Sequence, residues 1–262
     1  MTNLLPLLYV IPLGLISGLL TIYLVDMLPL TRRVETESIP WLTQMSRPAC
    51  NRCFAPLTWA EYLSLKNCQE CQQRRVVRTR WVLVFFLLVA VYLWLVPTVQ
   101  MHFFDGLLFL IFLVTAALID IDHRVVLTEM TLVGAGLAFW LGLRLHGWQS
   151  TLIGCAAGFG LMLALYLLGI GFSRLISRMR GENLEEVALG FGDVYFTGVL
   201  GLILGWPVIA ACLFLAVVLG GLFSGGYMAW TALRKRYKPL VAIPYVPFLV
   251  LAAVLMLYIP KW

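Results

Sequence analysis

Charged side chains are scarce in this chain: they make up 12% of its 262 residues, while 61% are hydrophobic and the mean hydropathy is +0.92. Soluble globular domains carry about 25% charged residues, so this composition excludes a soluble protein of this length. What charge there is leans basic, with 19 Lys and Arg against 13 Asp and Glu. The composition predicts an all-α, polytopic membrane protein.

We expect no removable signal peptide. The first apolar run, 4–28, has no basic residue before it and no small-residue cleavage site after it. We expect it to remain as a transmembrane helix closed by Pro29. Runs long enough to cross a bilayer predict about eight spans, at 4–28, 81–98, 102–119, 125–144, 150–172, 192–206, 207–230 and 240–259.

Glycines and prolines within these runs predict local features of the helices. The two prolines that open the last run should kink it; they are Pro244 and Pro247. Four glycines in the fifth run favour close helix packing; they are Gly154, Gly158, Gly160 and Gly169.

The basic residues set the expected orientation in the membrane. Of the 19, only Arg144 and Lys261 fall on one side of the spans; the other 17 lie in the segments 30–80, 120–124, 173–191 and 231–239. The positive-inside rule makes these segments cytoplasmic and places both chain ends outside. Because the basic residues lie beside membrane helices, lipid headgroups are their expected partners and nucleic acid is not.

Histidine occurs only three times, as His102, His123 and His146. The span assignment places His102 and His146 on the outer side of the membrane. No pairing of histidine with a serine or cysteine nucleophile is therefore predicted, and a histidine-ligated metal hydrolase is equally hard to build.

Four of the six cysteines lie in the polar segment 30–80, as Cys50-Asn51-Arg52-Cys53 and Cys68-Gln69-Glu70-Cys71. Two C-x-x-C knuckles with fourteen residues between them match a tetrathiolate zinc site. Two disulfides are disfavoured in a reducing cytoplasm, and a thioredoxin-like redox motif would need a βαβ pattern that is absent. The segment has few apolar side chains, so metal would supply most of its folding energy.

We expect several other residues to have structural rather than chemical roles. Trp59, Tyr62 and Leu63 share one helix face, and we expect them to form a small core under the metal or to contact the membrane surface. Asp26 is expected at a solvated helix end, and the basic run 72–80 is expected to anchor the second span at the lipid headgroups. Two further cysteines stand singly in apolar runs and are expected to pack there; they are Cys155 and Cys212.

Two acids interrupt the apolar sequence at places where a charge is costly. Asp193 follows Gly190-Phe191-Gly192 at the start of one run, and Asp120 closes another. Both fall at the predicted cytoplasmic ends of their helices, and ionisable residues in such places are candidates for function. Asp122 lies two residues after Asp120, so on a helix one of them can face the bundle while the other faces water.

Two carboxyl groups within a few ångströms cannot both stay ionised, so the pair shares one proton. Such a pair can activate water as a general base and protonate a leaving amine as a general acid, which is the chemistry of peptide hydrolysis. A proton-coupled transporter is the main alternative, although Asp26, Asp105 and Glu129 lie near the ends of runs rather than at mid-bilayer. A non-catalytic scaffold, in which the acids are helix-end charges, is another.

These motifs together resemble the type IV prepilin peptidases, intramembrane aspartic proteases of the GxGD kind. The resemblance rests on Gly190-Phe191-Gly192-Asp193, Ile119-Asp120-Ile121-Asp122, eight spans and the four-cysteine segment after the first span. It implies that Asp120 and Asp193 are the catalytic pair and that Cys50, Cys53, Cys68 and Cys71 bind zinc. It also implies cleavage of leader peptides from prepilins or pseudopilins at the inner membrane, and methylation of the new N-terminus with S-adenosylmethionine in many members.

The chain departs from this family's pattern in several places. Tyr195 replaces a common lysine, Val126-Leu127-Thr128 replaces Leu-Pro-Asp, and Tyr245-Val246-Pro247 stands where F-G-P is usual. The first span's usual pattern is reduced to Gly18-Leu19-Leu20-Thr21-Ile22, and the loop between the knuckles is shorter than usual. Because the family's second activity is expected to depend on these parts, a peptidase without methyltransferase activity is a further alternative. The predicted division is a first helix at 1–29, a zinc-binding loop at 30–80 and a seven-helix peptidase domain at 81–262.

Overall fold

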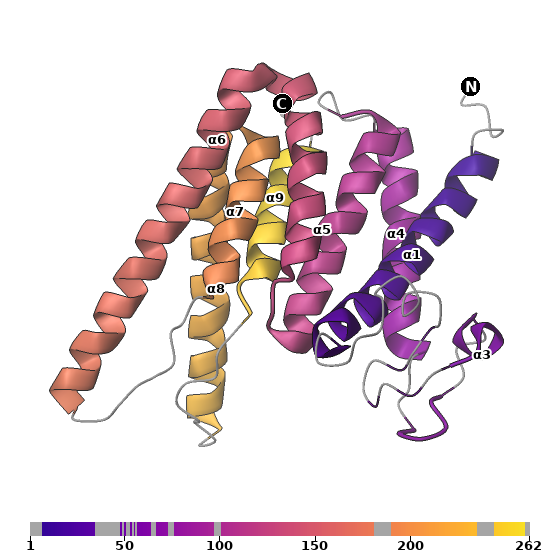
Figure 1. The fold of residues 1–262 in the computed structure, drawn as a ribbon, viewed down its shortest axis with the longest axis horizontal. Coiled ribbons are helices and arrows are strands. Elements are labelled where there is room, and N and C mark those ends of the chain that lie inside the picture. The colour runs from indigo at the N-terminus through magenta and orange to yellow at the C-terminus, as the bar shows by residue number, and fades with distance from the viewer. Residues whose placement is uncertain are drawn as a thin grey trace. The chain divides into compact units, whose positions relative to one another are not determined.

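The computed structural model describes most of the chain, namely residues 7–34, 48, 50, 53, 55, 57–63, 67–72, 76–96, 101–180, 190–234 and 244–259. Within these ranges the apolar runs form helices and no strand occurs (Figure 1). The predicted all-α fold is therefore confirmed. The chain divides into two compact units, residues 1–119 and 120–262, and the three-part division remains a prediction.

The first unit contains α1 (Leu7–Val34), which packs along α4 (Val76–Leu95). Helix α1 continues through Pro29, so the prediction that this proline ends it is wrong. Long apolar helices tolerate proline where neighbouring groups compensate for the lost backbone hydrogen bond. Helix α4 begins five residues before the predicted span. The basic side chain of Arg78 is therefore part of a helix rather than of a loop.

A short helix, α3 (Trp59–Leu63), carries the aromatic face predicted between the cysteine pairs. It begins with a reciprocal cap, in which Thr58 N–H donates to Glu61 at 3.0 Å and Glu61 N–H donates to Thr58 at 3.3 Å. The rings of Trp59 and Tyr62 pack against Tyr23 of α1, at centroid distances of 5.6 and 6.2 Å. This aromatic face therefore docks α3 onto the first helix. The side chain of Leu63 lies outside the described residues.

Asp26 is fully buried in α1, with an exposed fraction of 0%, so the prediction of a solvated helix end is wrong. Its carboxylate accepts a hydrogen bond of 2.9 Å from the hydroxyl of Tyr62 and forms an ion pair with Arg78. A buried charge requires partners of this kind. Arg78 thus pairs with Asp26, and this cluster joins α1, α3 and α4.

Replacing Asp26 with Asn is expected to lower the free energy of unfolding by about 1–3 kcal/mol. The amide can still accept a hydrogen bond from Tyr62, but Arg78 loses its counter-charge, and Arg78 is 31% exposed, which moderates the loss. Thermal unfolding of the purified protein in detergent measures the change. The control is Glu129→Gln, because Glu129 is exposed. Equal unfolding temperatures for the two variants would show that the cluster does not stabilise the unit.

The second unit contains α6 (Thr128–Arg180), α7 (Phe191–Leu204), α8 (Val208–Leu233) and α9 (Val246–Tyr258). Helix α6 holds the predicted fourth and fifth spans and folds back at Gly147, whose φ of 77° and ψ of 172° break the helical path (Figure 1). A positive φ is accessible to glycine at little cost. Helices α7 and α8 are separated by the turn Gly205–Pro207, at the boundary predicted around Trp206-Pro207.

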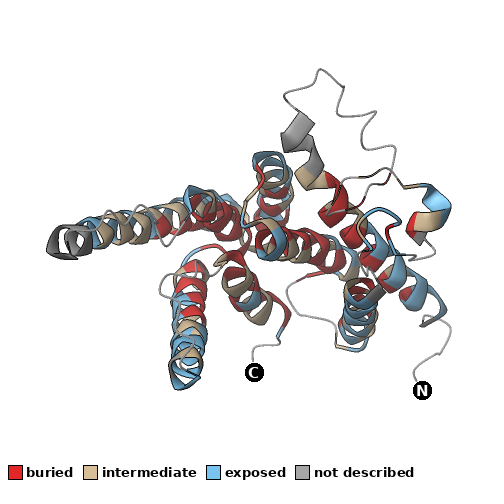
Figure 2. Cartoon of the chain, turned by 90° about the horizontal axis from the view of Figure 1, so that it is seen from below, coloured by how far each residue is buried: buried red, intermediate tan, exposed pale blue. Residues whose placement is uncertain are grey.

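Helix α7 is the most buried element of this unit, since eleven of its fourteen residues are buried. Buried residues gather where the helices face one another, and exposed residues lie on their outer faces (Figure 2). It packs closely against α6, where a Cβ on Gly154 would collide with the Gly201 carbonyl and one on Gly158 would lie 2.7 Å from the Thr197 carbonyl. The predicted packing role is confirmed for these two glycines. It is wrong for Gly160 and Gly169, because a Cβ built on either would have no atom of the described residues within 4 Å.

Helix α9 begins with its prolines instead of being kinked by them. Pro244 precedes the helix and Pro247 lies in its first turn, where the missing N–H would have no helical partner. The kink prediction is therefore wrong, because within the described residues the helix starts at Val246.

Five helices of the described chain are long and apolar enough to cross a membrane, and α7 and α9 are shorter apolar helices. Large apolar side chains on α8, such as Phe214 and Leu222, are more than two-thirds exposed. Such extensive apolar exposure suits contact with lipid. The chain is accordingly a multi-pass membrane protein.

Candidate functional site

Asp120 lies in the last turn of α5 (Phe103–His123), which is followed by the turn 124–127. Its exposed fraction is 6%, and its Oδ2 accepts a hydrogen bond of 3.1 Å from the backbone N–H of Val246 at the start of α9. Asp122 is exposed. The prediction that one of these acids faces inward and the other outward is confirmed, because two residues rotate a helical side chain by more than half a turn.

Asp193 lies in the first turn of α7 and has an exposed fraction of 7%. Its Oδ2 accepts a hydrogen bond of 3.0 Å from Gly190 N–H, and its own N–H donates to the Gly190 carbonyl at 3.1 Å. The carboxyl group therefore caps the helix on which it stands, which fixes its position. A negative charge near a helix N-terminus is also favoured by the helix dipole.

The structure brings the two acids together from helices whose sequences are more than seventy residues apart. The charge of Asp120 acts on Asp193, and the guanidinium of Arg124 acts on Asp120. Arg124 adopts a φ of 54° on the tight turn after α5, and its N–H donates to the Asp120 carbonyl at 2.8 Å. Two adjacent, mostly buried carboxyl groups of this kind can share a proton and exchange it with a substrate.

Gly192 allows the turn after α5 to approach the start of α7. A Cβ built on Gly192 would lie 2.8 Å from the Cβ of Val126, closer than real side chains come. A Cβ on Gly190 would meet only ordinary contacts, the nearest at 3.7 Å from Asp193 Oδ2. The glycine required for close approach is therefore Gly192, and the group that approaches is a valine side chain.

Sequence reasoning missed three further groups around the acids. The Val246 N–H that binds Asp120 is a backbone donor and leaves no trace in the sequence. Arg124 was treated only as a topology signal. The hydroxyl of Tyr245 is buried beside the same cluster; its one sequence signal is its place in the Tyr245-Val246-Pro247 motif.

His146 lies at the opposite end of α7 from Asp193, where its Nε2 is 2.9 Å from the carbonyl oxygen of Ile203. Thr151 Oγ1 lies 3.2 Å from the other ring nitrogen. This histidine is therefore engaged in joining α6 to α7. The geometry agrees with the expectation that it does not take part in chemistry at the acids.

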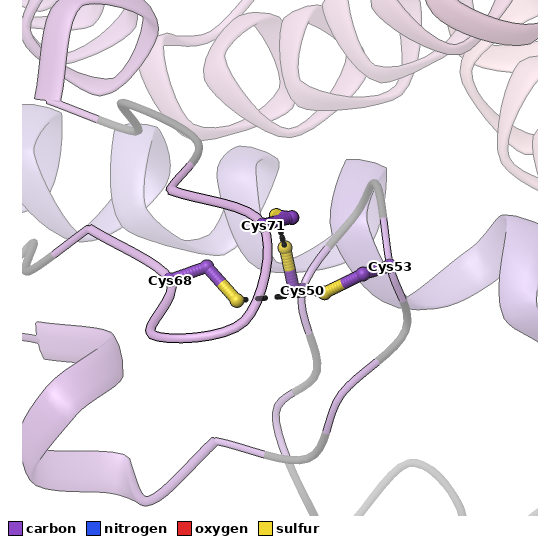
Figure 3. A group of neighbouring side chains, drawn as sticks. All are labelled: Cys50, Cys53, Cys68 and Cys71. Carbon is purple, nitrogen blue, oxygen red and sulfur yellow. Dashed lines mark hydrogen bonds between the residues drawn. The ribbon is translucent and has the colours of Figure 1, made fainter.

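The four predicted metal-ligating cysteines, Cys50, Cys53, Cys68 and Cys71, converge on one point of the first unit (Figure 3). Their sulfur atoms all lie within 4.8 Å of one another, with Cys50 and Cys71 at 3.5 Å and Cys53 and Cys68 at 3.4 Å. A disulfide needs about 2.05 Å between sulfurs, and none of the four cysteines forms one. The group could therefore hold a metal ion.

The donor set fits a tetrahedral zinc ion. Zinc–thiolate bonds of about 2.3 Å place the sulfurs of a tetrahedron about 3.8 Å apart, close to the observed separations. Backbone N–H groups of Cys71 and Glu70 lower the pKa of the Cys68 thiol to about 7. A thiolate is the form that binds metal, so the local backbone favours the ligand state of this residue. The remaining two cysteines, Cys155 and Cys212, lie on α6 and α8.

Comparison with known proteins assigns a class to the helical region that holds the acids. Residues 107–225 match the type IV leader peptidase family, in agreement with the resemblance seen in the sequence. A prepilin leader peptidase/N-methyltransferase of Myxococcus xanthus (strain DK1622) is 28% identical over 188 residues. The alignment covers 66% of this chain but 51% of that relative, so the chain spans about half of the relative's length. No solved structure matches.

Proposed function

We propose that this protein is a membrane aspartic endopeptidase that removes the leader peptide from type IV prepilins or pseudopilins. The observation that supports this most is the placement of Asp120 and Asp193, two buried acids within electrostatic range of each other. Both fall inside the segment that matches the leader peptidase family. Perturbed, paired acids at the ends of apolar helices are an expected site of acid–base catalysis.

In the proposed reaction one carboxyl group is ionised and the other is protonated. The ionised group takes a proton from water while the water oxygen bonds to the scissile carbonyl carbon, and the carbonyl electron pair moves onto its oxygen. The carbonyl then reforms, the carbon–nitrogen bond breaks, and the protonated group gives its proton to the leaving amine. The two acids finish with their protonation states exchanged.

The substrate is proposed to be a peptide segment at the inner face of the membrane, just ahead of an apolar helix. Under the positive-inside rule, the basic segments of the chain support a cytoplasmic position for Asp120 and Asp193. This orientation, in a bacterial inner membrane, leaves the basic leader in the cytoplasm and the apolar helix in the lipid. Membrane lipids are then partners of the exposed apolar helix faces.

We propose zinc as the metal of Cys50, Cys53, Cys68 and Cys71, because four converging thiols match its preferred ligands. When bound, zinc would cross-link the two knuckles and stabilise the loop. The aromatic face of α3 and the Asp26 cluster fix this loop against α1 and α4. We propose that this loop holds the substrate leader, or a methyl donor, beside the membrane.

N-methylation of the new N-terminus with S-adenosylmethionine is a second proposed activity. It is supported by the name of the similar protein from Myxococcus xanthus, a prepilin leader peptidase/N-methyltransferase. Because the alignment covers about half of that protein, a peptidase without this activity remains the alternative.

One experiment tests both activities. Purified protein is incubated with a leader-bearing prepilin peptide, with and without S-adenosylmethionine, and the products are read by mass. We expect the leader to be released in both reactions, and a gain of about 14 Da on the mature product only where the methyl donor is present, because a methyl group replaces a hydrogen atom. An intact peptide in both reactions would contradict the peptidase proposal, whereas unmodified mature product would contradict methylation alone.

Gly192→Ala is expected to lower the rate of cleavage about 10- to 100-fold. The added methyl group would meet Val126 at 2.8 Å and push the turn after α5 away from α7, which displaces Asp120 from Asp193. Initial rates with the prepilin peptide measure the effect.

The matched control is Gly190→Ala. Gly190 has a φ of −81° and a ψ of 148°, which alanine adopts freely, and its added Cβ meets only ordinary contacts. It should remain within a few-fold of the parent. A second variant, Gly192→Ala with Val126→Gly, removes the colliding group and should recover much of the lost rate. Equal rates for Gly192→Ala and the parent would refute the proposed close approach.

A further inference from the structure

Tyr245, the residue directly before α9, carries a buried hydroxyl that has no hydrogen-bond partner. It is the one side-chain nitrogen or oxygen atom of the described residues that is both inaccessible and unpaired. Buried polar groups in folded proteins almost always find a partner, and an exception asks for an explanation. The hydroxyl is thus a free donor inside the second unit.

The surroundings of Tyr245 fix its ring and identify the acid near its hydroxyl. The ring packs against Phe248 with centroids 6.5 Å apart, and a Cβ on Gly220 of α8 would lie 3.5 Å from its Cε2. The phenol interacts electrostatically with Asp193 of α7 and with Cys212 of α8. Asp193 is the only carboxyl group among these interactions.

Asp193 has an oxygen atom that can accept a hydrogen bond from the Tyr245 hydroxyl. Its Oδ2 accepts a hydrogen bond from Gly190 N–H, whereas its Oδ1 accepts none from any residue that the structure describes. Meanwhile Val246, the next residue after Tyr245, donates its backbone N–H to Asp120 at 3.1 Å. At the start of α9, Tyr245 therefore lies beside Asp193, and the next residue, Val246, lies beside Asp120.

We propose that Tyr245 is a positioning residue for Asp193, whose hydroxyl donates a hydrogen bond to Oδ1 when substrate is bound. The inference rests on the proposed peptidase function. The hydrogen bond stabilises the ionised carboxylate, which is the form that takes a proton from the attacking water, and it orients the second oxygen toward that water. No bond to Tyr245 is made or broken, and its proton stays on the phenol oxygen.

Other ionisable groups near Tyr245 and Asp193 also affect whether Asp193 is ionised. Asp120 faces Asp193 from the end of α5 and would oppose its ionisation, and Arg124 acts on Asp120. Cys212 of α8 lies beside the phenol, and Cys155 of α6 lies 4.0 Å from a Cβ built on Gly198 of α7. The phenol is the side-chain donor that can offset the repulsion between the acids.

The test compares the pH dependence of cleavage in Tyr245→Phe and in the parent. Phenylalanine keeps the buried ring and removes one oxygen, so the packing against Phe248 is retained. Because the ionised carboxylate loses a donor, kcat is expected to fall about tenfold with little change in KM. The acidic limb of the kcat profile should move up by about one pH unit. Phe248→Leu, which alters the packing of the same ring but no hydrogen bond, should leave the limb in place.

A second substitution tests the hydrogen bond in the opposite direction. Replacing Tyr245 with 3-fluorotyrosine makes the phenol a stronger donor, so the acidic limb should move to lower pH than in the parent. An unmoved limb in both Tyr245 variants, or an equal shift in Phe248→Leu, would overturn the inference. If the parent cleaves no leader peptide at any pH, the proposed function fails instead, so the two failures are distinguishable.

Discussion

Replacing either Asp120 or Asp193 with asparagine is expected to reduce the rate of leader cleavage about 10⁴-fold. Asparagine has nearly the shape of aspartate, and its side-chain oxygen can still accept the hydrogen bond from Val246 or Gly190 N–H. The fold around each position should therefore persist. What is lost is the ability to take or give a proton. Initial rates with the prepilin peptide measure the effect.

Asp122→Asn is the matched control for these variants. Asp122 lies two residues from Asp120 on the same helix but is exposed, so its replacement should leave the rate within a few-fold of the parent. A rate near the parental one in either catalytic variant would contradict the assignment. An equal loss in Asp122→Asn would show that the charge of the turn matters rather than the buried pair.

Replacing Cys68 with serine is expected to reduce bound zinc from about one ion per chain to nearly none, because four thiolates are needed to close the tetrahedron. The apparent free energy of zinc binding to such sites is about 10–16 kcal/mol at neutral pH. The loop would then lose its fold and become sensitive to proteases. Metal analysis of the purified protein, together with limited proteolysis, measures both effects.

Cys155→Ser is the control for zinc loss, since Cys155 is a free cysteine of α6 outside the cluster. It should retain the parental zinc content. A strong chelator should reproduce the protease sensitivity of Cys68→Ser in the parent protein. Full zinc occupancy in Cys68→Ser would contradict the four-cysteine site, and an unchanged digestion pattern after zinc removal would contradict its structural role.

Hydropathy predicted where the helices lie, because burial in lipid requires long apolar runs. Hydropathy predicted the ends of the helices less accurately, because tertiary contacts determine where a helix begins and ends. Helix α1 continues past Pro29, and α4 begins early enough to include Arg78. Asp26 was misinterpreted for the same reason, since its partners Tyr62 and Arg78 are 36 and 52 residues away in the chain. No local pattern shows such pairs.

The sequence predicted the main residues of the candidate site, but not the groups that position them. Asp120 and Asp193 attract attention because a charge against an apolar run is costly, and the cysteines because their spacing is specific. The structure places each set together. The Val246 N–H and the free hydroxyl of Tyr245 could not be foreseen, because the start of α9 reaches the acids only through the folded packing of the second unit.

The measurement that tests the central claim most directly is the binding of two matched peptide analogues of the cleavage site. One carries a tetrahedral hydroxyl group at the scissile carbon, and the other carries a methylene group there. If Asp120 and Asp193 act together on one reacting carbon, the parent should bind the hydroxyl analogue at least about 100-fold more tightly. Replacing either acid with asparagine should remove this advantage. Equal affinity of the parent for both analogues, or an advantage that survives the loss of either acid, would contradict the account.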